Sequence, residues 1–210
     1  MNEIDAQTQL VLASASPRRL ALLQSMGLRV VQRAVDVDET PRAQESAAAL
    51  VHRLAAAKAR AGRRLAIAEL PALGADTVVV LDGRILGKPR DRRDALAMLA
   101  ALSGRVHEVL SGVAVATTPD DVQVRISRST VHFREIPAAE AARYWESGEP
   151  RDKAGAYGIQ GIGGVFVERL DGSFSGVMGL PVAETEQLLR AAGVDCWRHR
   201  ADPGAEEVIS

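Results

Sequence analysis

Apolar and polar positions alternate along this chain in a way that predicts strands interleaved with helices. A short strand is expected at 9–13, and between Pro17 and Gly27 apolar residues recur at helical spacing. A second helix is expected over 44–62, with Lys58 just beside its apolar face. The first third of the chain therefore predicts a strand and two helices.

The middle of the chain has the pattern of antiparallel strands. A valine-rich strand over 73–81 is followed by an Asp-Gly pair, which is a two-residue hairpin signal, and by a return strand at 84–86. Two longer strands are expected over 106–117 and 122–133. Because these hairpins occur among alternating strands and helices, we expect an α/β fold with a mixed, twisted sheet.

Helices and a glycine-rich loop complete the pattern. Helices are expected over 91–102, 137–147 and 181–193. The segment 148–164 has the composition of a loop that carries functional groups, and a last hairpin is expected to turn at 171–172.

Length and composition narrow the class of protein. The 210 residues suit a single domain, expected over 1–193, and 194–210 lacks periodicity and is expected to be a flexible tail. With 47% apolar residues, 25% charged residues and a net charge of −1, the chain does not resemble a nucleic-acid binder. The polar N-terminus, the lack of a long apolar run and the single cysteine, Cys196, lead us to expect a cytoplasmic protein without a membrane partner.

The loop after the first strand has the groups needed to bind phosphate. Ser16 suits the N-cap of the following helix and Pro17 its first position, so free N–H groups point toward the loop. Ser14 adds a second hydroxyl, and Arg18 and Arg19 add two guanidinium groups. The same loop residues also fit a capped helix whose arginines are exposed to solvent. This segment by itself leaves both interpretations open.

Two carboxylates and two lysines are further candidates. Asp76 lies early in an apolar strand, where an unpaired charge is costly, so we expect a cationic or metal partner for it. Glu39 offers a second carboxylate, and two carboxylates with phosphate oxygens and waters suit Mg²⁺ or Mn²⁺. Lys88, in a Gly-Lys-Pro loop, and Lys58 offer ammonium groups, although either lysine taken alone is more simply interpreted as a surface residue.

The chain carries five sequence motifs in a fixed order. Together they indicate a protein family more specifically than any one motif does. They are LVLASASPRRLALL at 10–23, GADTVVVLDGRILGKPRD at 74–91, LSGRVHEVLSGVAV at 102–115, GEPRDKAGAYGIQGIGG at 148–164 and GVMGLPVAET at 176–185. In these motifs and in their order, the chain resembles the Maf family of nucleotide pyrophosphatases from Leu10 to about Leu189.

The resemblance implies a fold, a reaction and a set of site residues. It implies two lobes around a central cleft, similar to inosine-triphosphate pyrophosphatases, a homodimer, and hydrolysis of a nucleoside triphosphate between the α- and β-phosphates. Asp76 stands at the family's proton acceptor, and we also expect it to bind the metal with Glu39. Phosphate is expected to bind Ser14, Arg18, Arg19, Lys58 and Lys88, to which the loop chemistry adds Ser16.

The segment 152–161 resembles the branch of the family that acts on dTTP and UTP. Gln160 has both a donor and an acceptor for the edge of a uracil or thymine ring, and Thr77 and Arg18 stand at the other positions that the family links to specificity. A pyrophosphatase for 7-methyl-GTP or other non-standard triphosphates remains an alternative. A nucleotide-binding regulator of cell division is another, although it would have no need to retain Asp76 and Glu39.

Overall fold

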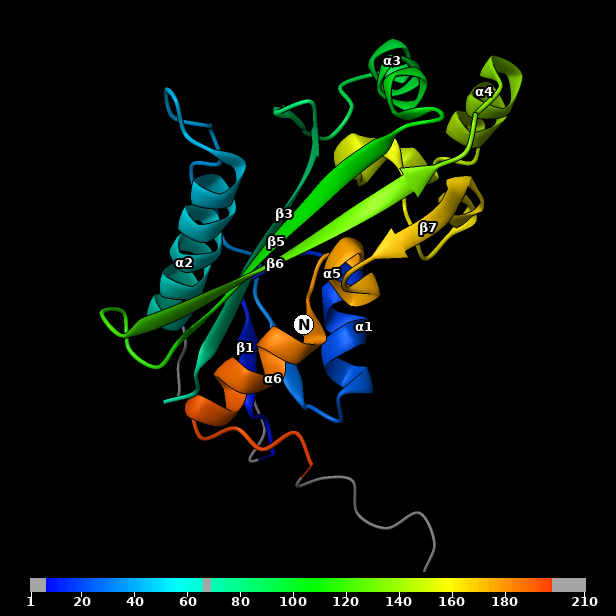
Figure 1. Cartoon of the computed structure of the whole chain (residues 1–210). Coiled ribbons are helices and arrows are strands. Elements are labelled where there is room, and N and C mark those ends of the chain that lie inside the picture. Colours follow the sequence, from blue (N-terminus) through cyan, green and yellow to red (C-terminus); the bar gives the residue numbers. More distant parts are fainter. Residues whose placement is uncertain (1–6, 66–68, 198–210) are drawn as a thin grey trace, which may run out of the picture.

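The computed structural model describes residues 7–65 and 69–197, which form a mixed seven-stranded sheet with helices on both faces (Figure 1). The order is β2-β1-β3-β5-β6-β7, with β4 paired to β3. β1 pairs in parallel with β2 and β3, and the other pairs are antiparallel, so the expected mixed α/β sheet is confirmed. The strands are β1 (Leu10–Leu12), β2 (Val30–Gln32), β3 (Ala72–Leu81), β4 (Arg84–Leu86), β5 (Val106–Ala116), β6 (Val122–Phe133) and β7 (Val167–Asp171).

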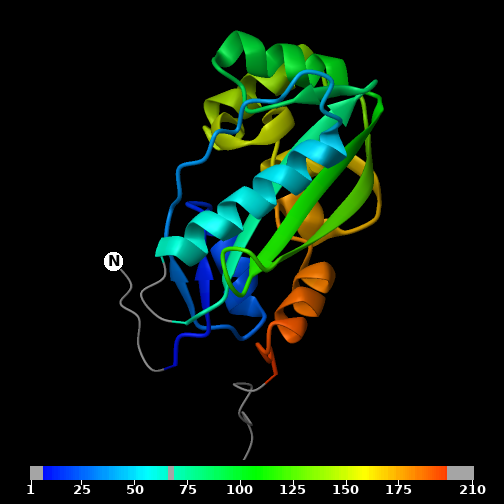
Figure 2. The same cartoon turned by 90° about the vertical axis from the view of Figure 1, so that its left-hand side faces the viewer.

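The long helix α2 covers one face of the sheet, and α1, α5 and α6 lie on the opposite side (Figures 1 and 2). The helices are α1 (Pro17–Ser25), α2 (Ala47–Leu65), α3 (Arg92–Leu102), α4 (Ala138–Glu146), α5 (Phe174–Met178) and α6 (Val182–Ala191). Three short 3-10 helices, η1 (Glu149–Asp152), η2 (Ala154–Ala156) and η3 (Ile162–Phe166), lie within the segment expected to be a loop.

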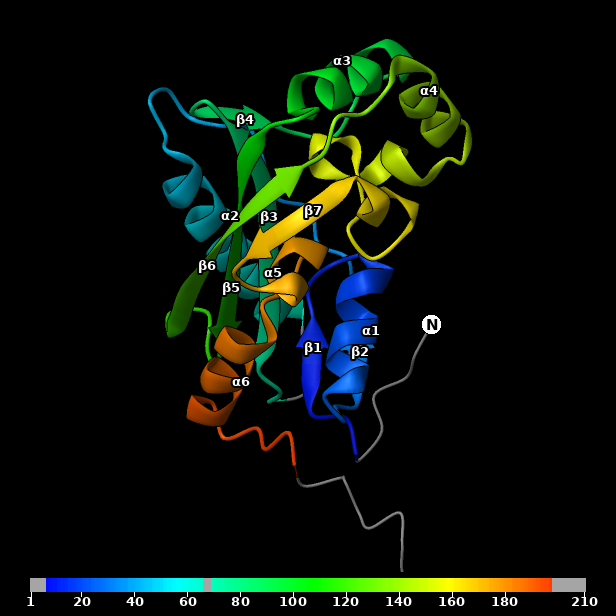
Figure 3. The same ribbon diagram turned by 45° about the vertical axis from the view of Figure 1, so that its right-hand side comes forward.

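The two largest apolar clusters among the described residues correspond to the two expected lobes, whose ribbons Figure 3 shows. One is built from β1, α1, α6 and the adjoining parts of β3 and β5, and includes Leu12, Leu23 and Leu189. The other joins α3, α4 and the 3-10 helices to the far ends of β3, β5 and β6, and includes Leu99 and Phe166. Because β3 and β5 run through both lobes, they fix the lobes relative to each other.

Two glycines let α2 approach the sheet closely. A Cβ atom on Gly74 of β3 would lie 2.4 Å from the backbone nitrogen of Ala59 and 2.5 Å from the carbonyl of Ala55. A Cβ atom on Gly112 of β5 would lie 2.5 Å from the carbonyl oxygen of Val51. Any larger residue at either position would push the helix away from the sheet.

The structure corrects several expected elements. The turn at 171–172 does not start a hairpin, because Ser173 caps α5 by accepting a hydrogen bond from the backbone N–H of Gly176. The three-residue strand β2 and the helix α5 were not expected. The second helix spans 47–65 rather than 44–62, and Lys58 lies on its buried face rather than beside it.

The packed part of the chain extends past the domain boundary expected at 193. Val194 and Cys196 are buried with the apolar core of the β1 lobe, so the flexible tail expected over 194–210 does not begin at Val194. The rest of the expected tail, 198–210, lies outside the described residues. Across 7–65 and 69–197, no helix has the length and apolar character needed to cross a membrane.

We predict that Gly112→Ala destabilises the fold, because its Cβ atom would meet the backbone of α2. Overpacking of this kind costs about 1–3 kcal/mol of unfolding free energy, which urea denaturation measures. Gly87→Ala is the matched control, since its Cβ atom would have no neighbour within 4 Å. Equal stability of the two variants would contradict the close approach of α2.

Candidate active site

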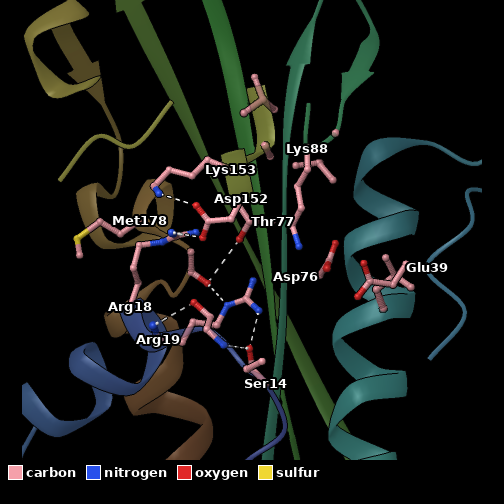
Figure 4. Close-up of a pocket in the computed structure, with 18 of the residues that line it drawn as sticks. Ser14, Arg18, Arg19, Glu39, Asp76, Thr77, Lys88, Asp152, Lys153 and Met178 are labelled. Carbon is pink, nitrogen blue, oxygen red and sulfur yellow. Dashed lines mark hydrogen bonds and ion pairs between the residues drawn. The ribbon is translucent and has the colours of Figure 1, made fainter. Parts of the chain in front are cut away.

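A cavity of about 610 Å³ is lined by residues of both lobes (Figure 4). Its size is that of a site for a small molecule. The sequence-predicted residues that line it are Ser14, Ser16, Arg18, Arg19, Glu39, Lys58, Asp76, Thr77, Lys88 and Gln160. The structure thus brings all the candidates together, and the role of each stays a prediction.

The loop before α1 holds Arg19 in one orientation. Ser16 is the N-cap of α1, as expected, and accepts a hydrogen bond from the backbone N–H of Arg19. The Arg19 side chain donates from Nη1 to Ser14 Oγ at 3.2 Å and from Nε to the Gly179 carbonyl at 2.8 Å. Burial lowers the pKa of Arg19 from its usual value, while the nearby carboxylate of Asp76 opposes that shift. A half-buried guanidinium held by neutral acceptors keeps its charge for an anion.

An ion pair joins Arg18 to the other lobe. Arg18 Nη1 lies 3.1 Å from Asp152 Oδ2, and Lys153 Nζ donates to Asp152 Oδ1 at 2.7 Å. Partial burial acts against ionisation of Asp152, but the hydrogen bonds and charges of Lys153 and Arg18 together outweigh it and lower the pKa of Asp152. Sequence reasoning had not assigned a role to Asp152 or Lys153, although both lie in the quoted 148–164 motif.

Lys58 lies between the two carboxylates. Its Nζ atom is 2.7 Å from Asp76 Oδ1 and 2.6 Å from Glu39 Oε1, and both Lys58 and Asp76 are buried. Partial burial opposes ionisation of Glu39, but the hydrogen bond and charge of Lys58 lower its pKa. Asp76 therefore has the cationic partner expected for a charge in an apolar strand.

The donor set around Lys58 fits a divalent cation only in part. Asp76 and Glu39 converge on one point, and carboxylate oxygens are the ligands that Mg²⁺ and Mn²⁺ prefer. Within the described ranges no group of three or more His, Cys, Asp or Glu side chains could hold a metal ion. Phosphate oxygens and waters would have to supply the remaining ligands.

Arg53 on α2 fixes the loop that carries Glu39. Its guanidinium donates to the carbonyls of Asp38 at 3.3 Å and Thr40 at 3.0 Å, on either side of Glu39. It also pairs with Glu45 at 2.6 and 2.7 Å, and these bonds lower the pKa of Glu45 to about 2. This anchor was missed because its residues are spread over two elements that sequence spacing does not relate.

The carboxylate of Glu149 organises the loop that carries Gln160. It accepts hydrogen bonds from Tyr144 Oη at 2.7 Å and from the backbone N–H groups of Ile162 at 2.9 Å and Gly163 at 3.1 Å. The loop therefore wraps around a negative charge, which its own N–H groups satisfy. Glu149 was also missed, since an acidic residue at a helix end has many simpler interpretations.

The chain matches a known protein family over most of its length. The family profile described as Maf-like protein matches residues 9–192. The chain belongs to the Maf family. The chain is 51% identical over 203 residues to the dTTP/UTP pyrophosphatase of Saccharophagus degradans, covering 95% of this chain and 96% of that protein. It is also 51% identical over 193 residues to the dTTP/UTP pyrophosphatase of Alkalilimnicola ehrlichii, covering 90% and 95%.

Among solved structures, this Maf protein partly overlaps the nucleoside-triphosphatase, or dITP/XTP pyrophosphatase, of Mycobacterium abscessus. The TM-score is 0.42 and the identity 22%, over 62% of this chain and 76% of that one.

We predict that the Glu45–Arg53 pair gives the Maf protein a specific dependence of stability on pH. The pKa of Glu45 falls from 4.5 to about 2 on folding, so the pair contributes fully above pH 4.5 and its contribution is lost as pH falls toward 2. The Tm difference between the wild type and Glu45→Gln should therefore be largest above pH 4.5 and close toward pH 2. Calorimetry over this pH range measures it.

Glu146→Gln is the control, because Glu146 is an exposed residue at the end of α4. Its Tm difference from the wild type should be small at every pH. A Tm difference for Glu45→Gln that does not change with pH would contradict the prediction.

Proposed function

We propose that this Maf protein hydrolyses dTTP and UTP to the nucleoside monophosphate and pyrophosphate. The observation that carries the proposal is that one paired carboxylate, Asp76, and the cations Arg18, Arg19 and Lys88 line a single cavity (Figure 4). The names of the relatives at about half identity, dTTP/UTP pyrophosphatase, support this choice of reaction and substrate.

In the proposed mechanism Asp76 accepts a proton from a water molecule. Lys58 donates to its Oδ1 atom, and within the described part of the chain no other side chain bonds to the carboxylate, so Oδ2 can orient the water. The water oxygen attacks the α-phosphorus, the bond from that phosphorus to the bridging oxygen breaks, and pyrophosphate leaves with the electron pair. No covalent enzyme intermediate is required.

The basic residues would stabilise the charge that develops on the phosphate oxygens. Arg19 is oriented by Ser14 and Gly179, and Lys88 is exposed at the opposite wall of the cavity. Such fixed donors lower the barrier because they need no reorganisation during the reaction. Glu39 and Asp76 would hold Mg²⁺ or Mn²⁺, which neutralises part of the triphosphate charge when bound.

Gln160 and the neighbouring specificity positions would select a pyrimidine. Gln160 lines the cavity at the tip of the loop held by Glu149, where its amide can pair with a ring that offers both donors and acceptors. We further propose that the protein acts as a homodimer in the cytoplasm, as the family resemblance implies. Light scattering of the purified chain tests the dimer.

We predict that Asp76→Asn lowers kcat for dTTP and UTP by about 10²–10⁴-fold, which is the usual contribution of a general base. KM should change less, because the phosphate-binding cations remain. Turnover is measured as the release of pyrophosphate from dTTP, UTP, CTP, GTP and 7-methyl-GTP. Each assay is run with Mg²⁺, with Mn²⁺ and with a chelator.

Asp120→Asn makes the same chemical change in an exposed turn between β5 and β6 and should keep wild-type turnover. Turnover of purine nucleotides without turnover of dTTP or UTP would overturn the proposed preference for pyrimidine substrates. Unchanged kcat in Asp76→Asn would overturn the role of Asp76, and turnover with the chelator present would overturn the metal requirement.

A further inference from the structure

The hydroxyl of Thr77 lines the cavity and is backed by a buried serine. Thr77 on β3 and Ser111 on β5 are register partners, and their hydroxyl oxygens lie 2.7 Å apart. Ser111 is only 1% exposed and is not part of the cavity wall. Behind it, Ser111 Oγ lies 2.6 Å from the carbonyl oxygen of Gly176 in α5.

These two short distances fix where both hydroxyl protons lie. The carbonyl of Gly176 can only accept, so the single proton of Ser111 points to it. Two oxygens 2.7 Å apart need a proton between them, and Ser111 has none left, so Thr77 donates to Ser111 rather than to the carbonyl oxygen of Gly179, which is 3.5 Å away. The oxygen of Thr77 can therefore present only lone pairs to the cavity.

We propose that Ser111 is a positioning residue that makes Thr77 an obligate hydrogen-bond acceptor, so that the site selects nucleotides whose nucleoside part presents an N–H or O–H donor there. This inference rests on the proposed nucleotide site and adds to it a specificity rule. Phosphate oxygens, which are acceptors at neutral pH, are disfavoured at this position. The cations that suit them are Arg18, Arg19 and Lys88.

Two parts of a nucleotide could supply the donor. The N3 atom of uracil or thymine carries a hydrogen, whereas N3 of cytosine carries a lone pair, so an acceptor at Thr77 would separate UTP from CTP. A sugar hydroxyl is the other source, and it would separate UTP from 2′,3′-dideoxy-UTP. When a lone pair of the Thr77 oxygen faces a lone pair of the ligand, neither group has a hydrogen-bond partner. Ligands without a donor at this position are therefore disfavoured.

The test is the ratio of kcat/KM values for UTP against CTP and for UTP against 2′,3′-dideoxy-UTP in the wild type and in Ser111→Ala. Without Ser111 the hydroxyl of Thr77 keeps, within the described part of the chain, only the long contact of 3.5 Å to the carbonyl oxygen of Gly179, so it can turn and donate to the ligand. One ratio should then fall by about tenfold, the effect of one buried hydrogen bond. A fall in the CTP ratio identifies the base as the donor, and a fall in the dideoxy ratio identifies the sugar.

Ser129→Ala is the matched control for the loss of a buried strand serine next to α5. Ser129 is 2% exposed, accepts from Ser173 N at 3.0 Å and donates to Ser173 O at 3.3 Å, and it has no part in the cavity wall. Both alanine variants should lose stability, but only Ser111→Ala should change a substrate ratio. In a Thr77→Val background, Ser111→Ala should change neither ratio further, since Ser111 acts through Thr77.

Unchanged ratios in Ser111→Ala would overturn the proposal, as would an equal change in Ser129→Ala or an additional change in the Thr77→Val background. Failure of the proposed function is a separate result, because the wild type would then release no pyrophosphate from any triphosphate. In that event calorimetric binding of UMP, CMP and 2′,3′-dideoxy-UMP to the same variants gives the corresponding affinity ratios, which test the role of Ser111 without turnover.

Discussion

The close contact between α2 and the sheet at Gly74 and Gly112 is the constraint on which the candidate site depends. Gly74 lies two residues before Asp76 on β3, and Gly112 is the register partner of Asp76 on β5. With no side chains at these positions, the helix backbone reaches the sheet and buries Lys58 directly against Asp76. A buried carboxylate without this partner would carry a large desolvation cost. The same packing that stabilises the helix thus keeps Asp76 paired with Lys58 at the cavity wall.

The alternation of side chains along β3 separates two tasks. Asp76 points to the α2 face, where Lys58 and Glu39 meet it, whereas Thr77 points to the opposite face, where Ser111 and α5 lie. In the proposed function, adjacent residues of one strand would therefore reach the reacting phosphate and the selected nucleoside group from different sides. Neither contact can be moved without disturbing a strand that is held in both lobes.

Much of this could be predicted from the sequence, because long periodic segments and ordered motifs carry strong signals. The strands at 106–117 and 122–133 and the cavity residues around Asp76 are of this kind. The hairpin expected at 171–172 was wrong because Ser173 caps a five-residue helix too short to show a period. Ser111, Glu149 and Arg53 were missed because their roles depend on partners distant in sequence, which only the fold brings into contact.

The pairing of charges in the cavity supports the proposal that a divalent cation binds with the triphosphate. Lys58 is shared by Asp76 and Glu39, so this group of three retains one net negative charge. Arg18 is already paired with Asp152, whereas Arg19 is held by neutral acceptors and has no carboxylate within ion-pair distance in the described part of the chain. A triphosphate brought to Arg19 would meet the negative group beside Asp76 and be repelled by it, because Coulomb interactions are strong in a partly buried site. Asp76 and Glu39 would hold a divalent cation whose charge would offset that repulsion, and Arg19 and Lys88 would then orient the triphosphate.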